Sequence, residues 1–521
     1  MTMTSNFKPI AVAVVTALSL SSCAITQSVE ENKETVIGCA IGTGLGVLIG
    51  NYLGGKKGMA YGGAAGAAIG CTVGYDFQKK REALEALAKT ENLDIQFTSI
   101  SASTNADNQQ NSLLISANNQ AMSKEDQEKY SDYQVVGMAA TISSTDEMMF
   151  GSGSAEATAQ AKQKLQKLAA IYKDSKQNIL ITGHTDASGS ESLNQRLSEA
   201  RARYVATLFN QAGIPTERLF FQGAGESQPV AANSDDSGKA KNRRVEIVEI
   251  DGKPDQLLAY SYKQRANLSY LSRRSQDKVA TVKPTQVVKQ SETQPTKPSI
   301  SISEPAQIEM SQSEIVKLLE PVKLEKALVD FGGKEMLDPS TNFAQLVGVK
   351  KESGFALFSK AYASEVSSLN CAVEGPRVTG DVKSLATGES YSRNDYNTAD
   401  YLPGMNGTVW VNKVNGHYIG LTPVAVIKDS GTAVSAPKVN IWKNYKGSSK
   451  DAPSYQLTSH VETYYGDKGL LYRVFTTEKD SPVRCMDVVM PIDRSATAIA
   501  GKLYYEKNKT VYEANFEPKL L

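Results

Sequence analysis

The chain reads ILITGHTD at residues 179–186 and LNQRLSEARARYVATLF at residues 193–209, and these two stretches decide the fold of its middle part. The first opens with an apolar run of strand length, and Ser188 and Gly189 then turn the chain. The second stretch repeats its apolar residues at helical spacing, at Leu193, Leu197, Ala200, Tyr204 and Leu208. A buried strand therefore runs through a polar turn into an amphipathic helix.

The same alternation continues on both sides of this unit. An apolar stripe at helical spacing between residues 161 and 172 predicts an earlier helix, and residues 219–222 and 245–250 predict two more strands. Helices that alternate with strands favour a layered fold. We therefore expect residues 137–251 to form an α/β (α+β) sandwich, with helices covering one side of a sheet.

Polar residues collect where the strand meets the helix. Asn194 and Arg201 are seven positions apart and share one helix face, and Asp186 lies at the mouth of the turn that feeds this helix. An arginine fork suits a carboxylate, and an aspartate accepts from an ammonium group. One interpretation is a shallow pocket for a zwitterion, and the alternative is an internal salt bridge or a helix-capping acid.

Four blocks of sequence carry a family resemblance, namely GHTD at 183–186, LNQRLSEARA at 193–202, GAGE at 223–226 and NRRVE at 242–246. In this order they resemble the OmpA C-terminal, peptidoglycan-associated domain. The resemblance implies that Asp186 binds the amino group and Arg201 the carboxylate of the peptidoglycan diamino acid, usually diaminopimelate. It also implies a supporting contact from Asn194 and places Arg244 in a block lining the same region. The family's usual Phe-Asp is Phe150-Gly151 here, which puts one secondary contact in doubt.

Composition and motifs argue against several other functions. A net charge of +1 gives no reason to expect a nucleic-acid partner. The three histidines have no metal-ligand spacing around them, and the chain has no nucleophile elbow or phosphate loop. We therefore expect no enzyme activity, no catalytic residue, no metal site and no cofactor, and we interpret His184 as structural.

The N-terminus indicates export. An apolar run over residues 10–20 ends in Leu20-Ser21-Ser22-Cys23, which resembles a lipobox. This predicts a signal peptide at residues 1–22 and acylation of Cys23, and Ala24 implies sorting to the outer membrane with the domains facing the periplasm. In the alternative, the signal peptide is cut elsewhere and Cys23 is incidental.

Residues 23–76 carry a glycine at every fourth position, at Gly38, Gly42, Gly46, Gly50, Gly54, Gly58, Gly62, Gly66, Gly70 and Gly74. Glycines at this spacing let helices approach closely, so we expect a glycine-zipper hairpin that enters the bilayer or packs as a soluble or oligomeric hairpin. Cys39 and Cys71 lie symmetrically about the turn, and either form a disulfide or remain buried thiols.

Three further segments complete the predicted organisation. Residues 77–136 are interpreted as a partly ordered spacer and residues 252–312, rich in Lys, Gln, Ser, Thr and Pro, as a flexible linker. Residues 313–521 predict a β-rich domain of unknown family, with hairpins at 410–419, 455–475 and 503–513. In an oxidising compartment, Cys371 and Cys485 are expected to form a disulfide.

These expectations combine into one function. The chain is predicted to be an outer-membrane lipoprotein that ties the bilayer, through acylated Cys23, to peptidoglycan stem peptides. The alternative is a wall-anchored component of a secretion or motor complex, with the C-terminal domain docking an unknown protein partner. A wall hydrolase is disfavoured because catalytic spacing is absent.

Overall fold

A computed structural model of the protein describes residues 76–77, 79–103, 113–117, 133–144, 149–151, 153–281, 329–348, 368–393, 395–446, 452–492 and 497–520. The predicted signal peptide, Cys23, and the glycine-zipper hairpin with Cys39 and Cys71 lie outside these residues. Within the described ranges, no helix combines the length and the hydropathy needed to cross a bilayer.

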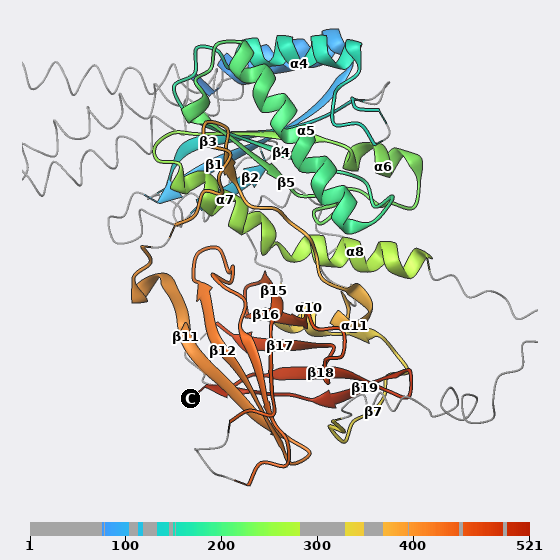
Figure 1. Ribbon diagram of the computed structural model, residues 1–521. Helices are drawn as coiled ribbons and strands as arrows, with labels where there is room; N and C mark the ends of the chain where they lie inside the picture. Colours follow the sequence, from blue (N-terminus) through green and yellow to red (C-terminus); the bar gives the residue numbers. More distant parts are fainter. Residues whose placement is uncertain are drawn as a thin grey trace, which may run out of the picture.

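A seven-stranded sheet forms the frame of the middle part, in the order β10-β5-β4-β6-β3-β1-β2 (Figure 1). Only β4 and β5 run parallel, and every other neighbouring pair is antiparallel. The predicted strands at 179–181, 219–222 and 245–250 are confirmed as β4, β5 and β6. The strands are β1 Leu93–Ser103, β2 Leu113–Ala117, β3 Tyr133–Ser144, β4 Asn178–Gly183, β5 Leu219–Gly223, β6 Val245–Ile250 and β10 Lys383–Ser384.

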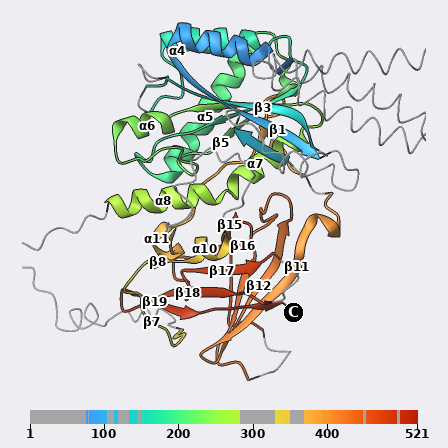
Figure 2. The same ribbon diagram turned by 180° about the vertical axis from the view of Figure 1, so that it is seen from behind.

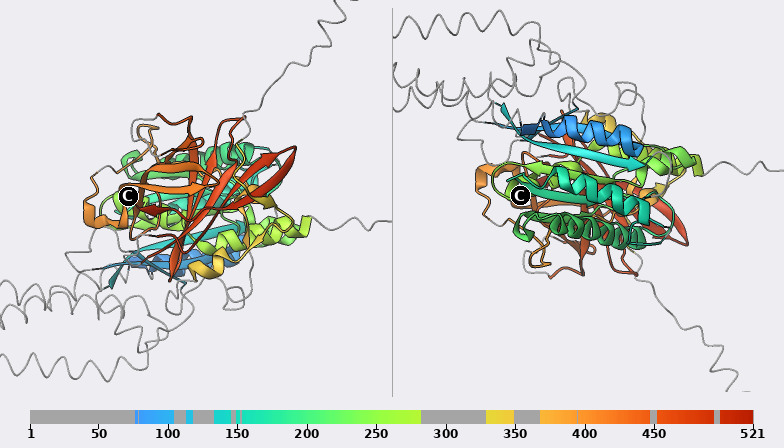
Figure 3. Two further views of the ribbon diagram at one scale, coloured as in Figure 1. Left: turned by 90° about the horizontal axis from the view of Figure 1, so that it is seen from below. Right: turned by 90° about the horizontal axis from the view of Figure 1, so that it is seen from above.

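Helices cover both faces of this sheet, so the expected one-sided layer is wrong. Helices α4 (Ala159–Ile171) and α5 (Glu191–Gln211) pack on one face, where Ile179 and Ile181 point into a core with Leu165 (Figure 3, right). Leu180 lies on the other face, in a second core that includes α7 (Asp255–Arg265). The sequence ILI is apolar without a break because both faces of β4 are buried.

The predicted spacer is part of the fold. Strand β1 pairs with β3 from Leu93↔Ser144 to Ser103↔Tyr133, and β2 pairs with β1, so both extend the sheet. A helix over residues 79–91 precedes β1, and its Leu84 is fully buried in the core with Leu165. The boundary of the folded unit therefore lies before residue 93.

The predicted linker also begins with ordered structure. Residues 255–281 form α7 and α8 (Leu268–Thr281), so the flexible-linker interpretation is wrong for this part of 252–312. Helix α8 lies between the upper and lower parts of the molecule (Figures 1 and 2). Its Leu268 and Leu271 pack with Phe343 and Val347 of the C-terminal part.

The C-terminal part is a sandwich of two antiparallel sheets, which confirms the β-rich prediction. A five-stranded sheet and a six-stranded sheet enclose one core around Trp410, Tyr472 and Phe516 (Figure 3, left). The first contains β11 Tyr401–Val414, β12 His417–Ile427, β13 Lys438–Trp442, β14 Tyr455–Leu457 and β20 Lys519–Leu520. The second contains β7 Lys334–Glu335, β15 Ser459–Tyr465, β16 Gly469–Thr476, β17 Cys485–Pro491, β18 Ala500–Lys507 and β19 Thr510–Asn515.

The predicted hairpins at 410–419 and 503–513 are confirmed as β11–β12 and β18–β19. The one at 455–475 is confirmed only from Ser459 onward, as β15–β16, because Tyr455–Leu457 form β14 and pair with β13 in the other sheet. Asn415 and Gly416, between β11 and β12, both have positive φ, as do Asn508 and Lys509 between β18 and β19. Such backbone matches the twist of the flanking strands, which is why Asn-Gly was an informative signal. The Cys371–Cys485 disulfide is also confirmed, and Cys371 opens the short helix α11 (Cys371–Glu374).

The two halves contact each other extensively. Strand β10 comes from the C-terminal half but pairs with β5 of the middle sheet, Lys383↔Phe221 and Ser384↔Phe220. Its neighbour Val382 is fully buried in the core beneath α7. On α8, Ser275 donates a 2.8 Å hydrogen bond to Glu374 of α11. The middle and C-terminal parts are therefore packed together within the described ranges.

Candidate functional site

The site forms where α5 lies close to the ends of β4 and β5. Gly183 ends β4, and a Cβ atom there would come 2.2 Å from the Ser198 carbonyl oxygen. Gly223 ends β5, and a Cβ atom there would come 2.5 Å from the Glu199 nitrogen. Any side chain would push the helix away, so these two glycines bring the polar face of α5 to the edge of the sheet.

Asp186 lies in the loop between β4 and α5. Its Oδ1 accepts a hydrogen bond from the Ser188 N–H at 2.9 Å, and its Oδ2 accepts one from Arg243 Nη1 at 2.6 Å. Burial raises the pKa of this carboxyl, but the Arg243 and Ser188 hydrogen bonds outweigh burial and leave the pKa below its ordinary value. The carboxylate is therefore ionised at neutral pH.

Asn194 holds the loop and the helix together. Its Nδ2 donates to the Asp186 carbonyl oxygen at 3.3 Å and to Glu226 Oε2 at 2.5 Å. Glu226 belongs to the GAGE block, so this amide joins three of the four blocks that carry the resemblance. Asn194 is 3% exposed, which makes it a positioning group within the site.

Arg201 lies on the same face of α5, two turns further along. Its guanidinium donates from Nε to the Ser154 carbonyl at 2.9 Å and from Nη2 to the Gly151 carbonyl at 3.2 Å, and it stacks over the Phe150 ring at 4.9 Å. Burial lowers its pKa to about 10, and the negative charge of Asp186 acts in the opposite direction. Asp186 and Arg201 are thus close enough for an electrostatic interaction, but the residue that forms an ion pair with Asp186 is Arg243.

Arg243 is the residue that sequence reasoning missed, and Arg244 does not reach this region. Arg244 is buried and donates to the Gln228 carbonyl oxygen at 3.0 Å. Its electrostatic neighbours are Tyr270 of α8 and Glu246 and Tyr260 beneath the sheet. Arg243 ends α6 (Asp236–Asn242) in a tight turn, in which the Arg244 N–H donates to the Asn242 carbonyl at 3.0 Å, and the two side chains leave this turn toward different neighbours. The sequence of the NRRVE block alone did not indicate which of the two arginines contacts Asp186.

His184 is buried beside Arg244. Burial, followed by the charge of Arg244, lowers its pKa well below the ordinary value, so the imidazole is neutral. Neither ring nitrogen has a hydrogen-bond partner among the described residues. In the same ranges, His, Cys, Asp and Glu side chains form no group of three that could hold a metal ion.

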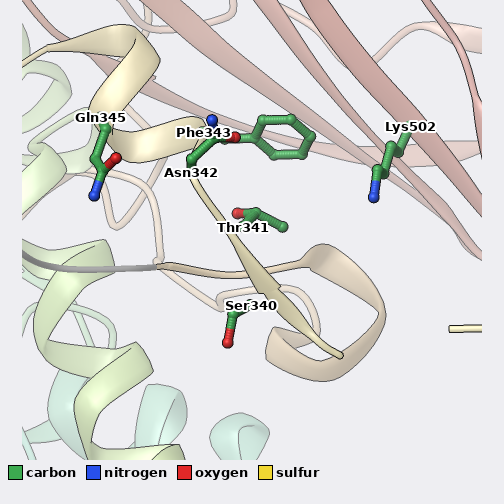
Figure 4. Close-up of a pocket in the computed structure, with 6 residues that line it drawn as sticks. All are labelled: Ser340, Thr341, Asn342, Phe343, Gln345 and Lys502. Atoms are coloured by element: carbon green, nitrogen blue, oxygen red, sulfur yellow. The ribbon is translucent and has the colours of Figure 1, made fainter. Parts of the chain in front are cut away.

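A separate open pocket of about 340 Å³ lies in the C-terminal part. Residues of β8 (Ser340–Thr341) and α10 (Phe343–Val347) line it together with Lys502 of β18 (Figure 4). Lys502 is ion-paired with Glu513 at 2.8 Å. This pocket does not adjoin Asp186 or Arg201 and contributes nothing to the site above.

Family models match two segments of the chain. Residues 149–243 match the OmpA family, and residues 3–78 match the YMGG-like Gly-zipper. The second match confirms the glycine-zipper prediction for the N-terminal segment. The first covers every residue of the site described here, from Phe150 to Arg243.

Similar proteins include envelope lipoproteins. Over 105 residues the chain is 36% identical to the outer-membrane lipoprotein YfiB of Pseudomonas aeruginosa, and over 99 residues it is 39% identical to the probable lipoprotein YiaD of Escherichia coli. These stretches are 20% and 19% of this chain, and they span 62% and 45% of the relatives, less than two thirds of either.

Among solved structures, the cell wall anchor of the T6SS from Pseudomonas aeruginosa is 30% identical, with a TM-score of 0.21. The match covers 24% of this chain and 92% of the anchor. From the family-model matches, residues 149–243 of this chain belong to the OmpA family, behind an N-terminal glycine zipper.

Proposed function

We propose that the protein binds peptidoglycan non-covalently, through the diamino acid of the stem peptide, and so tethers the outer membrane to the wall. The observation that carries the proposal is the placement of an ionised Asp186 just before α5 and of a partly engaged Arg201 further along the same helix, within the OmpA-family segment, where the charge of Asp186 acts on Arg201. A zwitterionic head group needs one fixed anion and one fixed cation.

Arg201 has further N–H groups with which it can bind a ligand carboxylate. The Ser154 and Gly151 carbonyls use two of its N–H groups, and a guanidinium has about five. Stacking on Phe150 fixes the plane of the fork before any ligand arrives. Less side-chain entropy is then lost on binding.

Asp186 has further lone pairs with which it can accept hydrogen bonds from a ligand ammonium group. Its oxygens accept hydrogen bonds from Arg243 and from Ser188, whereas an ionised carboxylate offers roughly four lone-pair positions. Arg243 therefore orients the carboxylate and need not leave when the ligand binds. The arginine of the NRRVE block that contacts Asp186 is thus Arg243, whereas the sequence prediction named Arg244.

Attachment through Cys23 would make weak contacts sufficient. Two charge-assisted contacts of about 1.5–3 kcal/mol each give modest single-site affinity once ordering costs are subtracted. A lipid anchor confines the domain beside a polymeric ligand, so the local ligand concentration stays high. In this proposal the lipid and the glycine zipper hold the chain at the outer membrane, and the site binds the wall.

Sedimentation of the full chain with purified peptidoglycan tests the proposal. Asp186→Asn removes the anion with little change of shape, and Arg201→Lys keeps the charge but loses the fork. Each change should weaken pelleting by about 10- to 150-fold, the equivalent of one charge-assisted contact.

Arg196→Ala is the matched control, because Arg196 is an exposed arginine on the same helix. It should pellet like the unchanged protein. Thermal unfolding of all three variants checks that folding is intact. Undiminished pelleting of both site variants, with the fold preserved, would contradict the proposal.

A further inference from the structure

Helix α8 holds a residue that supports the loop of Asp186, although the helix lies beyond the OmpA-family segment at residues 149–243. Its Asp277 accepts two hydrogen bonds from Asn233, one from the backbone N–H at Oδ1 and one from the side-chain Nδ2 at Oδ2, each of 2.8 Å. Two bonds from one residue to one carboxylate fix direction as well as distance. Asp277 therefore determines how the Asn233 side chain is turned.

The other end of the Asn233 amide holds the segments on which the Asp186–Arg243 ion pair lies. Its Oδ1 accepts a 3.0 Å hydrogen bond from the Ala187 N–H and a 2.9 Å hydrogen bond from Asn242 Nδ2. Ala187 directly follows Asp186, and Asn242 directly precedes Arg243. One amide oxygen thus joins the backbone beside the acid to the backbone beside its arginine partner.

Asp277 also selects which way round the Asn233 amide lies. With Nδ2 directed at the Asp277 carboxylate, Oδ1 faces the donors of Ala187 and Asn242. Turned over, the amide would place its N–H groups against those two donors and its oxygen against the carboxylate. Asn242 is itself fully buried, with its oxygen accepting two backbone N–H groups, so it cannot turn to follow.

The C-terminal part fixes the position of α8, and with it the position of Asp277. Leu271 of α8 packs with Phe343 of the C-terminal part, and Ser275 donates a 2.8 Å hydrogen bond to Glu374. Asp277 follows two positions beyond Ser275 and contacts the middle part instead. Figure 2 shows α8 between the two parts. The helix therefore links the packing of the C-terminal part to the loop of Asp186.

We propose that Asp277 is a positioning residue for peptidoglycan binding, acting through Asn233 on the Asp186 site, which comprises Asp186, Asn194, Arg201 and Arg243. Charged groups that bind a ligand must be held to within roughly 0.5 Å of the productive geometry by the bonds behind them. The inference rests on the proposed function, which assigns ligand binding to Asp186 and Arg201. It adds a residue from outside the OmpA-family segment and makes wall affinity depend on a helix that the C-terminal part holds.

Pelleting of the full chain with purified peptidoglycan tests the inference. Asp277→Asn keeps the size of the side chain but replaces one accepting oxygen with an NH₂ group, which then faces a donor of Asn233. Asn233→Asp places a second carboxylate opposite Asp277. Each change should lower the affinity by about fivefold or more, the lower end of the usual coupling between sites.

The double variant, Asn233→Asp with Asp277→Asn, should recover the affinity of the unchanged protein. The amide at position 277 can then donate to the carboxylate at position 233, whose other oxygen still accepts from Ala187 and Asn242. The two single changes alter the net charge in opposite directions. A purely electrostatic effect would therefore move the affinity in opposite directions, whereas loss of positioning lowers it in both.

Asp236→Asn is the matched control, because it removes an exposed aspartate of α6 and should pellet like the unchanged protein. Thermal unfolding of every variant checks the fold. Hydrogen exchange at the Ala187 amide, which donates to Asn233, should become faster in Asp277→Asn and not in the control.

Two results would overturn the inference. One is undiminished pelleting of both single variants alongside a loss in Asp186→Asn, and the other is a loss that the double variant does not recover. Undiminished pelleting of Asp186→Asn itself would instead contradict the proposed function, and the inference would fall with it.

Discussion

Two neighbours keep the Asp186 carboxyl ionised, so the proposed wall binding should weaken when acid protonates this group. Hydrogen bonds from Arg243 and Ser188 hold its pKa below the ordinary value of 3.8. A carboxyl whose pKa is lower in the folded than in the unfolded chain stabilises the fold at pH values above its unfolded pKa. This stabilisation is lost as the pH falls through the folded pKa. In the proposed function, the same protonation also removes the anion that would face the ligand's ammonium group.

We therefore predict that pelleting with peptidoglycan stays constant from neutral pH down to about pH 5 and falls only below 3.8. Pelleting assays over a pH series check this, with circular dichroism at each pH to confirm folding. In Asp186→Asn the remaining affinity should show no such step. A loss centred near pH 6 would instead indicate a histidine and contradict the assignment.

At the scale of single residues, the sequence identified some of the side chains that lie near one another here, but not all of them. Asp186 and Asn194 are in contact at the start of α5, and Arg201 follows two turns further along the same face, as their spacing on a strand–turn–helix unit suggested. Arg243 could not be chosen over Arg244, because the residues are adjacent and identical. The direction of each depends on the last turn of α6 (Asp236–Asn242), which sets where β6 begins.

At the scale of elements, β10 shows how a very short strand can close a sheet. The Gly380 N–H donates to the Gly223 carbonyl and the Leu385 N–H to the Leu219 carbonyl, each at 2.9 Å. Lys383 also pairs with Glu199 of α5 at 2.6 Å. These contacts cover the edge of β5, which would otherwise present unpaired backbone groups.

Val382→Asp should release this segment, because Val382 is fully buried and an unpaired carboxylate there is costly. Hydrogen exchange at the Gly380 and Leu385 amides should become faster by at least tenfold. Ala386→Asp is the control, since Ala386 is exposed in the turn that follows β10. If the Gly380 and Leu385 amides in Val382→Asp exchange as slowly as in the unchanged protein, the pairing of β10 does not depend on the buried Val382 side chain.

Elements of this kind were beyond prediction from the sequence. The long strands β11, β12 and β16 were all found, because alternation marks β11 and β12 and turn residues precede β16. Strand β10 has two residues, and its partner lies more than 150 positions earlier. Helix α8 was missed because its apolar stripe is interrupted by Arg273, Arg274 and Ser275. Arg274 and Ser275 both contact Glu374 of the other half.

At the scale of the whole molecule, the two halves are joined by a buried charged network. Arg274 of α8 lies 3.1 Å from Glu191 at the start of α5 and 3.9 Å from Glu374 of α11. Within the C-terminal half, Arg473 and Asp487 form a fully buried pair at 2.6 Å. The Arg473 guanidinium also donates to the Leu369 carbonyl, which precedes α11. Such groups require a fixed geometry, so they oppose independent movement of the halves.

We predict that the middle and C-terminal parts unfold in one calorimetric transition. Leu271→Ala, at a fully buried position between them, should cost about 2–5 kcal/mol and split the transition into two. Ser272→Ala, at the next position on α8, should leave a single transition. Two transitions in the unchanged protein would show that the halves are energetically independent.

Strand β10 also has a consequence for the order in which the chain matures. The β5 edge, at residues 219–223, emerges during synthesis and export long before residues 383–384, which complete the sheet. Until then the growing chain exposes an unpaired edge that another strand could take. A chain cut short between α8 and β10 would keep that edge open permanently. We therefore expect such fragments to aggregate, although they contain every residue of the Asp186 site.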